Sequence, residues 1–96
     1  MPGTLDARPA STRLDTWLWR ARVVKTRSLG AKLARSGHVR VNGRRSATAH
    51  QPVRVGDVLT IALERSVRML RVTAFGERRG PATEARALFE DIGADG

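Results

Sequence analysis

The sequence predicts an α+β domain, in which two N-terminal helices pack on a small, mostly antiparallel sheet and a short C-terminal helix follows. Two consecutive segments, 13–24 and 26–36, place apolar residues at helical spacing. Three later segments, 38–41, 53–63 and 66–75, are rich in Val, Leu and Ile, and an Asn-Gly pair follows the first of them. The chain has 96 residues and no internal repeat, which suits one small domain.

The first helix is predicted from Leu14, Leu18 and Ala21, which lie at positions i, i+4 and i+7, while Trp17 widens the same apolar stripe. Either Thr12 or Ser11 can supply its N-cap. Trp19 points away from the stripe. It either stacks on a nucleotide or packs against the strands, and packing is the commoner role of a lone aromatic residue.

The second helix is predicted to begin after Thr26, whose hydroxyl can accept a free N–H of the first turn. Its inward residues are Leu29, Leu33 and Ala34, and Lys32 and Arg35 point outward. Two glycines belong to the same segment. Gly37 fits the left-handed position that ends many helices, and Gly30 permits close approach of the first helix.

The strands follow from alternation and turn residues. Val39 and Val41 share one face, and Asn42-Gly43 predicts a type I′ turn after them. Strand segments are then expected over 53–55 and 58–63, separated by a Gly56-Asp57 turn, with 66–75 as the antiparallel partner. Core residues of that partner are Val67, Met69 or Leu70, and Val72.

The C-terminal segment 80–93 resembles a short helix, with Pro81 near its first position and a stripe of Ala85, Leu88 and Phe89. The acids around and after it are expected to form a solvated helix face and tail. We therefore divide the chain into a flexible tail over 1–12, a binding domain over 13–75, and a C-terminal helix with an acidic tail over 76–96.

Positive charge is concentrated in one part of the chain. The net charge is +9, and eleven of the 18 basic residues lie between Arg13 and Arg54, where Asp15 is the only acid. A general preference for Arg explains Arg over Lys, but not the lack of acids in one stretch. A nucleic acid is the favoured partner, and an acidic protein or a membrane surface are the alternatives.

Several functional classes are excluded or unsupported. The chain has no cysteine, which rules out a disulfide framework, a thiolate metal site and a cysteine nucleophile. His38 and His50 lie far apart without a carboxylate cluster, and no phosphate-cradling glycine loop or nucleophile motif occurs. We predict no metal, no cofactor and no enzymatic activity of the chain alone. No apolar run is long enough to span a membrane, so we predict no membrane partner and a cytoplasmic location.

The chemistry of anion binding gathers around the second helix. Lys25 and Arg27 bracket the Thr26 cap, and Ser28 adds a hydroxyl. Cations at a helix N-terminus are unfavourable for the helix itself, so their presence indicates that an anion is expected there. Further cations continue along the helix and over the hairpin: Lys32, Arg35, Arg40, Arg44 and Arg45. The alternative is that these side chains merely solvate an ordinary surface.

These residues also carry a family resemblance. The stretch "RLDTWLWRARVVKTRSLGAKLARSGHVRVNG", followed by "PVRVGDVL", resembles the S-four-type RNA-binding domain, also called the alpha-L motif. The Arg-Leu-Asp start, the "KTRS" opening of the second helix, the Gly-x-Val-x-Val-Asn-Gly pattern and the later Val-Gly-Asp carry it. "WLW", "KTRS" and "ERRGPATEARALFE" are most similar to the stand-alone, ribosome-associated heat-shock branch of that family.

The resemblance implies a structured RNA ligand held by the second helix and the adjoining hairpin. For the heat-shock branch it implies binding of ribosomal RNA on a large ribosomal subunit that carries a stalled nascent chain, with tRNA on that subunit as a further ligand, and recovery of the subunit. By position it places on the RNA surface Arg13, Lys25, Thr26, Arg27, Ser28, Lys32, Arg35, Arg40, Asn42 and Arg44, to which we add the neighbouring cations Arg20 and Arg45.

Two other functions stay open. Domains of this type also deliver RNA to pseudouridine synthases and tyrosyl-tRNA synthetases, so the chain could be the accessory subunit of an RNA-modifying enzyme or a tRNA synthetase. Binding of duplex DNA is the third reading. In isolation the chain is expected to be a monomer.

Overall fold

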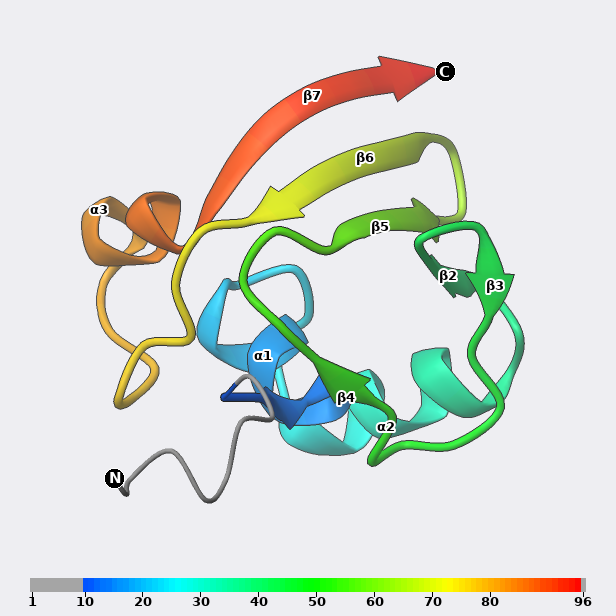
Figure 1. Cartoon of the computed structure of the whole chain (residues 1–96), viewed down its shortest axis with the longest axis horizontal. Coiled ribbons are helices and arrows are strands. Elements are labelled where there is room, and N and C mark those ends of the chain that lie inside the picture. The colour runs from blue at the N-terminus through cyan, green and yellow to red at the C-terminus, as the bar shows by residue number, and fades with distance from the viewer. Residues whose placement is uncertain (1–9, 96) are drawn as a thin grey trace, which may run out of the picture.

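A computed structural model describes residues 10–95 and shows the predicted α+β fold, with two N-terminal helices, antiparallel sheets and a short C-terminal helix (Figure 1). In chain order the elements are β1 (Thr12–Arg13), α1 (Leu14–Arg20), α2 (Arg27–Arg35), β2 (Val39–Val41), β3 (Arg44–Arg45), β4 (Pro52–Val53), β5 (Val58–Ala62), β6 (Val67–Val72), α3 (Ala82–Ala85), the 3-10 helix η2 (Arg86–Leu88) and β7 (Phe89–Asp95). The predicted tail over 1–12 lies mostly outside the described residues.

The main sheet has five strands in the order β3-β2-β5-β6-β7, and β1 pairs with β4 in a separate two-stranded ribbon. All neighbouring strands are antiparallel. Figure 1 shows α1 and α2 on one side of the sheet, and α3 beside the start of β7. The core lies between the helices and the sheet. Its largest fully buried side chains include Trp17, Leu14 and Leu18 from α1 and Leu59 and Ile61 from β5.

The start of α1 differs from the prediction. Its N-cap is Arg13, which makes no side-chain cap hydrogen bond. Thr12 instead belongs to β1 and is paired with Val53 in the β1–β4 ribbon. The first amides of the helix instead donate to the loop before β4, from Leu14 N to Gln51 O at 2.9 Å and from Asp15 N to Ala49 O. Backbone carbonyls thus replace the predicted Ser or Thr cap.

The signals within the second helix are mostly confirmed. Leu29 N donates to Thr26 Oγ1 at 3.1 Å, as expected for the N-cap, and Gly37 has φ +82° after the helix. Gly30 is buried against α1, where an added Cβ would lie 2.8 Å from the carbonyl oxygen of Asp15. The inward position of Leu29 was wrong, because its side chain is 46% exposed.

The hairpin turn and the strand faces agree with the alternation. Asn42 and Gly43 have φ of 52° and 86°, as a type I′ turn requires. Leu70, rather than Met69, lies in the core together with Val72 of the same strand, and Met69 is exposed beside Thr60. Val55 lies outside any strand and is 58% exposed.

The C-terminal segment contains a strand that the sequence did not predict. The helix α3 ends after one turn, Pro81 is its N-cap, and Phe89–Asp95 continues as β7 along β6. Part of the expected acidic tail is therefore an edge strand, on which Glu90 and Asp91 pair with Arg71 and Arg68. The domain boundaries stay predictions, although β7 belongs to the same sheet as β6.

Candidate nucleic-acid interface

Exposed cations extend from α2 over the β2–β3 hairpin. Each of these side chains is exposed, and the described part of the chain forms no ion pair with any of them. We call this set the cationic surface: Lys25, Arg27, Lys32, Arg35, Arg40, Arg44 and Arg45.

The start of α2 carries only positive charge. Its first turn contains no acid, and Thr26 uses its hydroxyl to cap Leu29 N. Ser28, one of the predicted contact residues, is exposed beside it. The remaining N–H groups of the first turn have no partner within the helix, and the exposed residues Lys25 and Arg27 lie beside them in the chain. Such an arrangement attracts an anion, because the helix dipole and both side chains have the same sign.

Arg27 is oriented by residues of α1. Its Cζ lies 5.4 Å from the centroid of the Trp19 ring, and its Nη2 donates to Thr16 Oγ1 at 3.4 Å. Trp19 is half-buried and so presents a face to a guanidinium of the same chain. This cation–π contact restricts the Arg27 side chain before any ligand arrives.

The hairpin brings two arginines into direct cross-strand opposition. Arg40 on β2 is paired with Arg45 on β3, and both are exposed. Like charges directly opposite one another destabilise a sheet, so the free protein gains nothing electrostatically from this pair. The stem of Arg45 also lies against Gly37, where an added Cβ would be 3.0 Å from Arg45 Cδ. Arg45 is thereby held beside Gly37, which follows the end of α2.

Arg13 has a partner in Asp15. Its Nε and Nη2 donate to the two carboxylate oxygens of Asp15 at 3.0 and 2.9 Å. Burial alone would raise the pKa of Asp15. Hydrogen bonds from the Arg13 side chain and the Thr16 backbone oppose this effect, as do the charges of Arg13 and Arg27. Together they lower the pKa of Asp15 below its ordinary value. The hydrogen bond with Asp15 correspondingly raises the pKa of Arg13. The Arg-Leu-Asp motif thus has a structural role at the start of α1.

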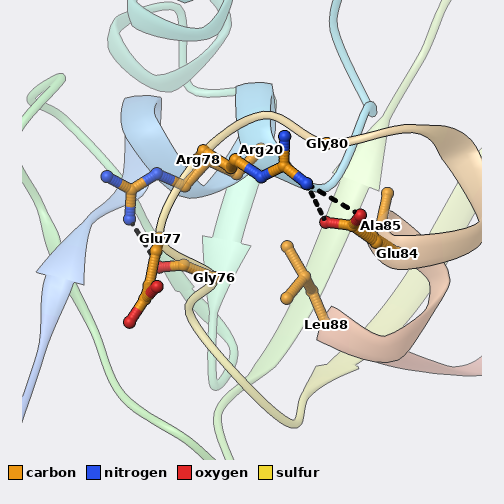
Figure 2. Close-up of a pocket in the computed structure, with 8 residues that line it drawn as sticks. All are labelled: Arg20, Gly76, Glu77, Arg78, Gly80, Glu84, Ala85 and Leu88. Carbon is orange, nitrogen blue, oxygen red and sulfur yellow. Dashed lines mark hydrogen bonds and ion pairs between the residues drawn. The ribbon is translucent and has the colours of Figure 1, made fainter.

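Arg20 and Arg22 lie against the loop before α3. Arg20 is half-buried and donates from Nη1 to Gly76 O at 2.8 Å, and Arg22 donates from Nε to Gly80 O at 2.7 Å. Figure 2 shows Arg20 reaching Gly76 and Arg78 reaching Glu84 around a small cavity of about 150 Å³. Arg20 therefore has an internal partner, and its predicted RNA contact stays a prediction.

Asn42 joins the hairpin turn to the turn before β5. Its amide nitrogen donates to Asp57 Oδ1, and its carbonyl oxygen accepts from Val58 N, both at 2.9 Å. Asp57 in turn accepts from Arg54 N through its other oxygen. The Val-Asn-Gly and Val-Gly-Asp motifs therefore interlock two turns, which positions the hairpin that carries Arg40, Arg44 and Arg45.

Other classes of site are not seen in the described residues. Residues 10–95 contain no group of three His, Cys, Asp or Glu side chains that could hold a metal ion. Within the same part of the chain, no helix has the length and apolar character needed to cross a membrane.

Comparison with known proteins identifies the family of the chain. The model of the S4 domain matches residues 12–59, a range that contains every predicted site residue. The chain belongs to the S4 domain family. S4 domains are RNA-binding domains, and proteins of this kind are typically non-catalytic.

Among its relatives are proteins named Heat shock protein 15. The Escherichia coli K12 protein is 40% identical over 88 residues, covering 91% of this chain and 65% of its own length. The Aeromonas salmonicida homolog is 38% identical over 90 residues, covering 90% of this chain and 67% of its own length. The chain thus spans about two thirds of these relatives, and the predicted resemblance to the heat-shock branch is confirmed.

A solved structure of Vibrio cholerae Heat Shock Protein 15 has a TM-score of 0.79 and 31% identity, covering 86% of this chain and 83% of that chain. That protein is described as trimeric. This finding stands against the expected monomer.

Proposed function

We propose that the S4 domain of this chain binds structured RNA through the cationic surface. One observation carries the proposal: these side chains are exposed on α2 and the β2–β3 hairpin, within the S4 match, and form no ion pair among the described residues. None of these side chains is buried in the core. The cross-strand opposition of Arg40 and Arg45 is unfavourable until an anion lies between or above them.

Binding is expected to depend on backbone phosphates and on shape. The major groove of A-form RNA is too deep and narrow for side chains to read base edges, whereas its phosphates and 2′-hydroxyls are accessible. The guanidinium of Arg27 is already oriented over Trp19, and Arg side chains can form bidentate contacts with phosphate. Little sequence specificity follows for a regular duplex.

We further propose that the ligand is ribosomal RNA of the large subunit carrying a stalled nascent chain, and that binding assists recycling of that subunit in the cytoplasm. The similarity to Heat shock protein 15 over 91% of the chain supports this assignment. Crosslinking in cells followed by sequencing of the bound RNA tests it. Recovery of large-subunit RNA is expected. Co-purification with an RNA-modifying enzyme or a tRNA synthetase, rather than with ribosomal subunits, would instead support an accessory subunit.

The salt dependence of affinity tests RNA binding itself. If about six phosphates are neutralised, a plot of log K against log salt should slope by roughly −4 to −5. Replacing Lys32 and Arg35 by Ala should weaken binding and reduce the steepness of that slope by about 1 to 2, with an unchanged melting temperature. The variant Arg65→Ala/Arg86→Ala removes the same charge from exposed positions outside the cationic surface and is the matched control. Salt-independent binding, or equal loss in both variants, would contradict the proposal.

A further inference from the structure

A shallow groove of about 600 Å³ lies beside α2, between the helix and the end of β5. Its lining is mostly apolar and comes from Val23 and Val24 before the helix, Leu29 and Leu33 on the helix, and Leu63 after the strand. This volume lies within the range of roughly 300–1,000 Å³ that is usual for small-ligand pockets. The groove shares Lys25 and Lys32 with the cationic surface, and its other lining residues lie outside that surface.

Leu29 is the most exposed apolar side chain of α2, with 46% of its surface accessible. Its backbone amide is fixed by the Thr26 cap, so the side chain is held over the groove by the first turn of the helix. A ligand that binds in the groove can cover this exposed apolar side chain.

The edge of the groove is cationic. Lys25 and Lys32 line it together with the apolar residues, both are exposed, and Glu64 is the only acid in the lining. Lys32 lies one helical turn after Leu29. At the other end, Ser36 Oγ and His38 Nδ1 lie 2.5 Å apart and add polar groups. A mostly apolar lining that also contains two ammonium groups matches the chemistry of a nucleotide in a strand, because a base is planar and weakly polar and has a phosphate on either side.

We propose that this groove accepts one unstacked nucleobase of the bound RNA, whose flanking phosphates are held by Lys25 and Lys32. The inference rests on the proposed function and deepens it, since it identifies the RNA feature as a bulge or loop beside a duplex. Unpaired bases can be turned out of a helix at low cost, and they are the usual target of specific recognition in RNA. The base covers Leu29 and Leu33, while the cationic surface holds the adjoining backbone.

The test compares two RNA hairpins that differ by a single bulged 2-aminopurine. Affinities of the full chain are measured by anisotropy, together with the fluorescence of the 2-aminopurine. The wild-type protein should bind the bulged hairpin about tenfold more tightly than the continuous one. Leu29→Ser should remove this preference and keep the affinity for the continuous hairpin. Val55→Ser replaces another exposed apolar side chain outside the groove, and should keep the preference.

The possible outcomes separate the two proposals. If the wild-type protein binds both hairpins equally, or if Leu29→Ser weakens both equally, the base site is refuted while RNA binding stands. If neither hairpin is bound, the proposed function itself fails. Sedimentation of the same variants identifies the competing occupant. Loss of an oligomer in Leu29→Ser alone would mean that a second copy of the chain covers the groove, which would also refute the base site.

Discussion

The arginines near the N-terminus differ in what their guanidinium groups contact. Arg13 is held by the Asp15 carboxylate, and Arg20 and Arg22 are held by carbonyls of the loop before α3. Arg35 and Arg40 have no such partner among the described residues. Charge counting treats all of these residues alike. The sequence could therefore locate the basic segment, but it could not separate structural arginines from available ones, because their partners lie up to 58 residues away along the chain.

The Arg13–Asp15 pair predicts a pH-dependent contribution to stability. The pKa of Asp15 is lowered in the folded protein, so its stabilising effect is complete above the ordinary value of 3.8 and is lost as the pH falls through the lower, folded value. Asp15→Asn should reduce the free energy of unfolding by about 1 kcal/mol at pH 7. The difference from wild type should shrink below about pH 4. Urea unfolding at several pH values measures it. Glu77→Gln is the control, and a difference that grows on acidification would contradict the account.

At the scale of elements, the sequence predicted the features that depend on nearby residues and missed those that depend on pairing between distant segments. The Thr26 cap and the Asn42-Gly43 turn depend on residues next to each other in sequence, and both are confirmed. The Ser11 or Thr12 cap failed because β4, far along the chain, pairs with this segment. Strand β7 was missed for the same reason. Its pairing with β6 includes a register shift at Met69/Leu70, which no periodic pattern in the segment itself reveals.

In the β2–β3 hairpin, we expect fold stability and RNA binding to favour opposite charges at position 40. Arg40→Glu would place opposite charges across the strands, facing Arg45, and should raise the free energy of unfolding by about 0.2–1 kcal/mol. The same substitution should weaken RNA binding, because it puts a carboxylate on the cationic surface. Thermal unfolding and RNA titration of one preparation measure both effects.

A charge-matched variant controls for this experiment. Arg71→Glu changes the charge equally, but it breaks the exposed pair with Glu90 on β7. It should lower stability slightly and leave RNA binding nearly unchanged. A hairpin variant that loses stability and keeps its affinity would show that Arg40 supports the fold and does not contact RNA.

At the scale of the whole molecule, the C-terminal segment is joined to the S4 core. Trp17 of α1 and Phe89 of β7 form an edge-to-face contact with centroids 6.3 Å apart, and Arg68 lies over the Phe89 ring at 5.5 Å. Trp17 Nε1 also donates to Ala74 O at 2.9 Å. The S4 match ends at residue 59, yet these contacts link its first helix to the last strand.

We therefore predict that Phe89→Ala destabilises the entire fold. The loss should be about 2–3 kcal/mol, below the range for a fully buried Phe because this ring is half-buried. Unfolding followed by Trp fluorescence and by far-UV circular dichroism should give one coincident transition, shifted to lower denaturant. Val55→Ala, at an exposed site, should leave the midpoint almost unchanged. A Phe89→Ala protein with an unshifted Trp transition would show that the C-terminal segment is energetically separate.

We infer that RNA lies on α2 and the β2–β3 hairpin. Backbone amide NMR spectra, recorded while a folded ribosomal RNA hairpin is added to the full chain, test it most directly. Shifts should concentrate at residues 25–28, 32, 35, 40, 44 and 45, and should reverse when salt is raised. Shifts confined to residues 76–93, or none at RNA concentrations that saturate an S4 domain of known ligand, would contradict the claim.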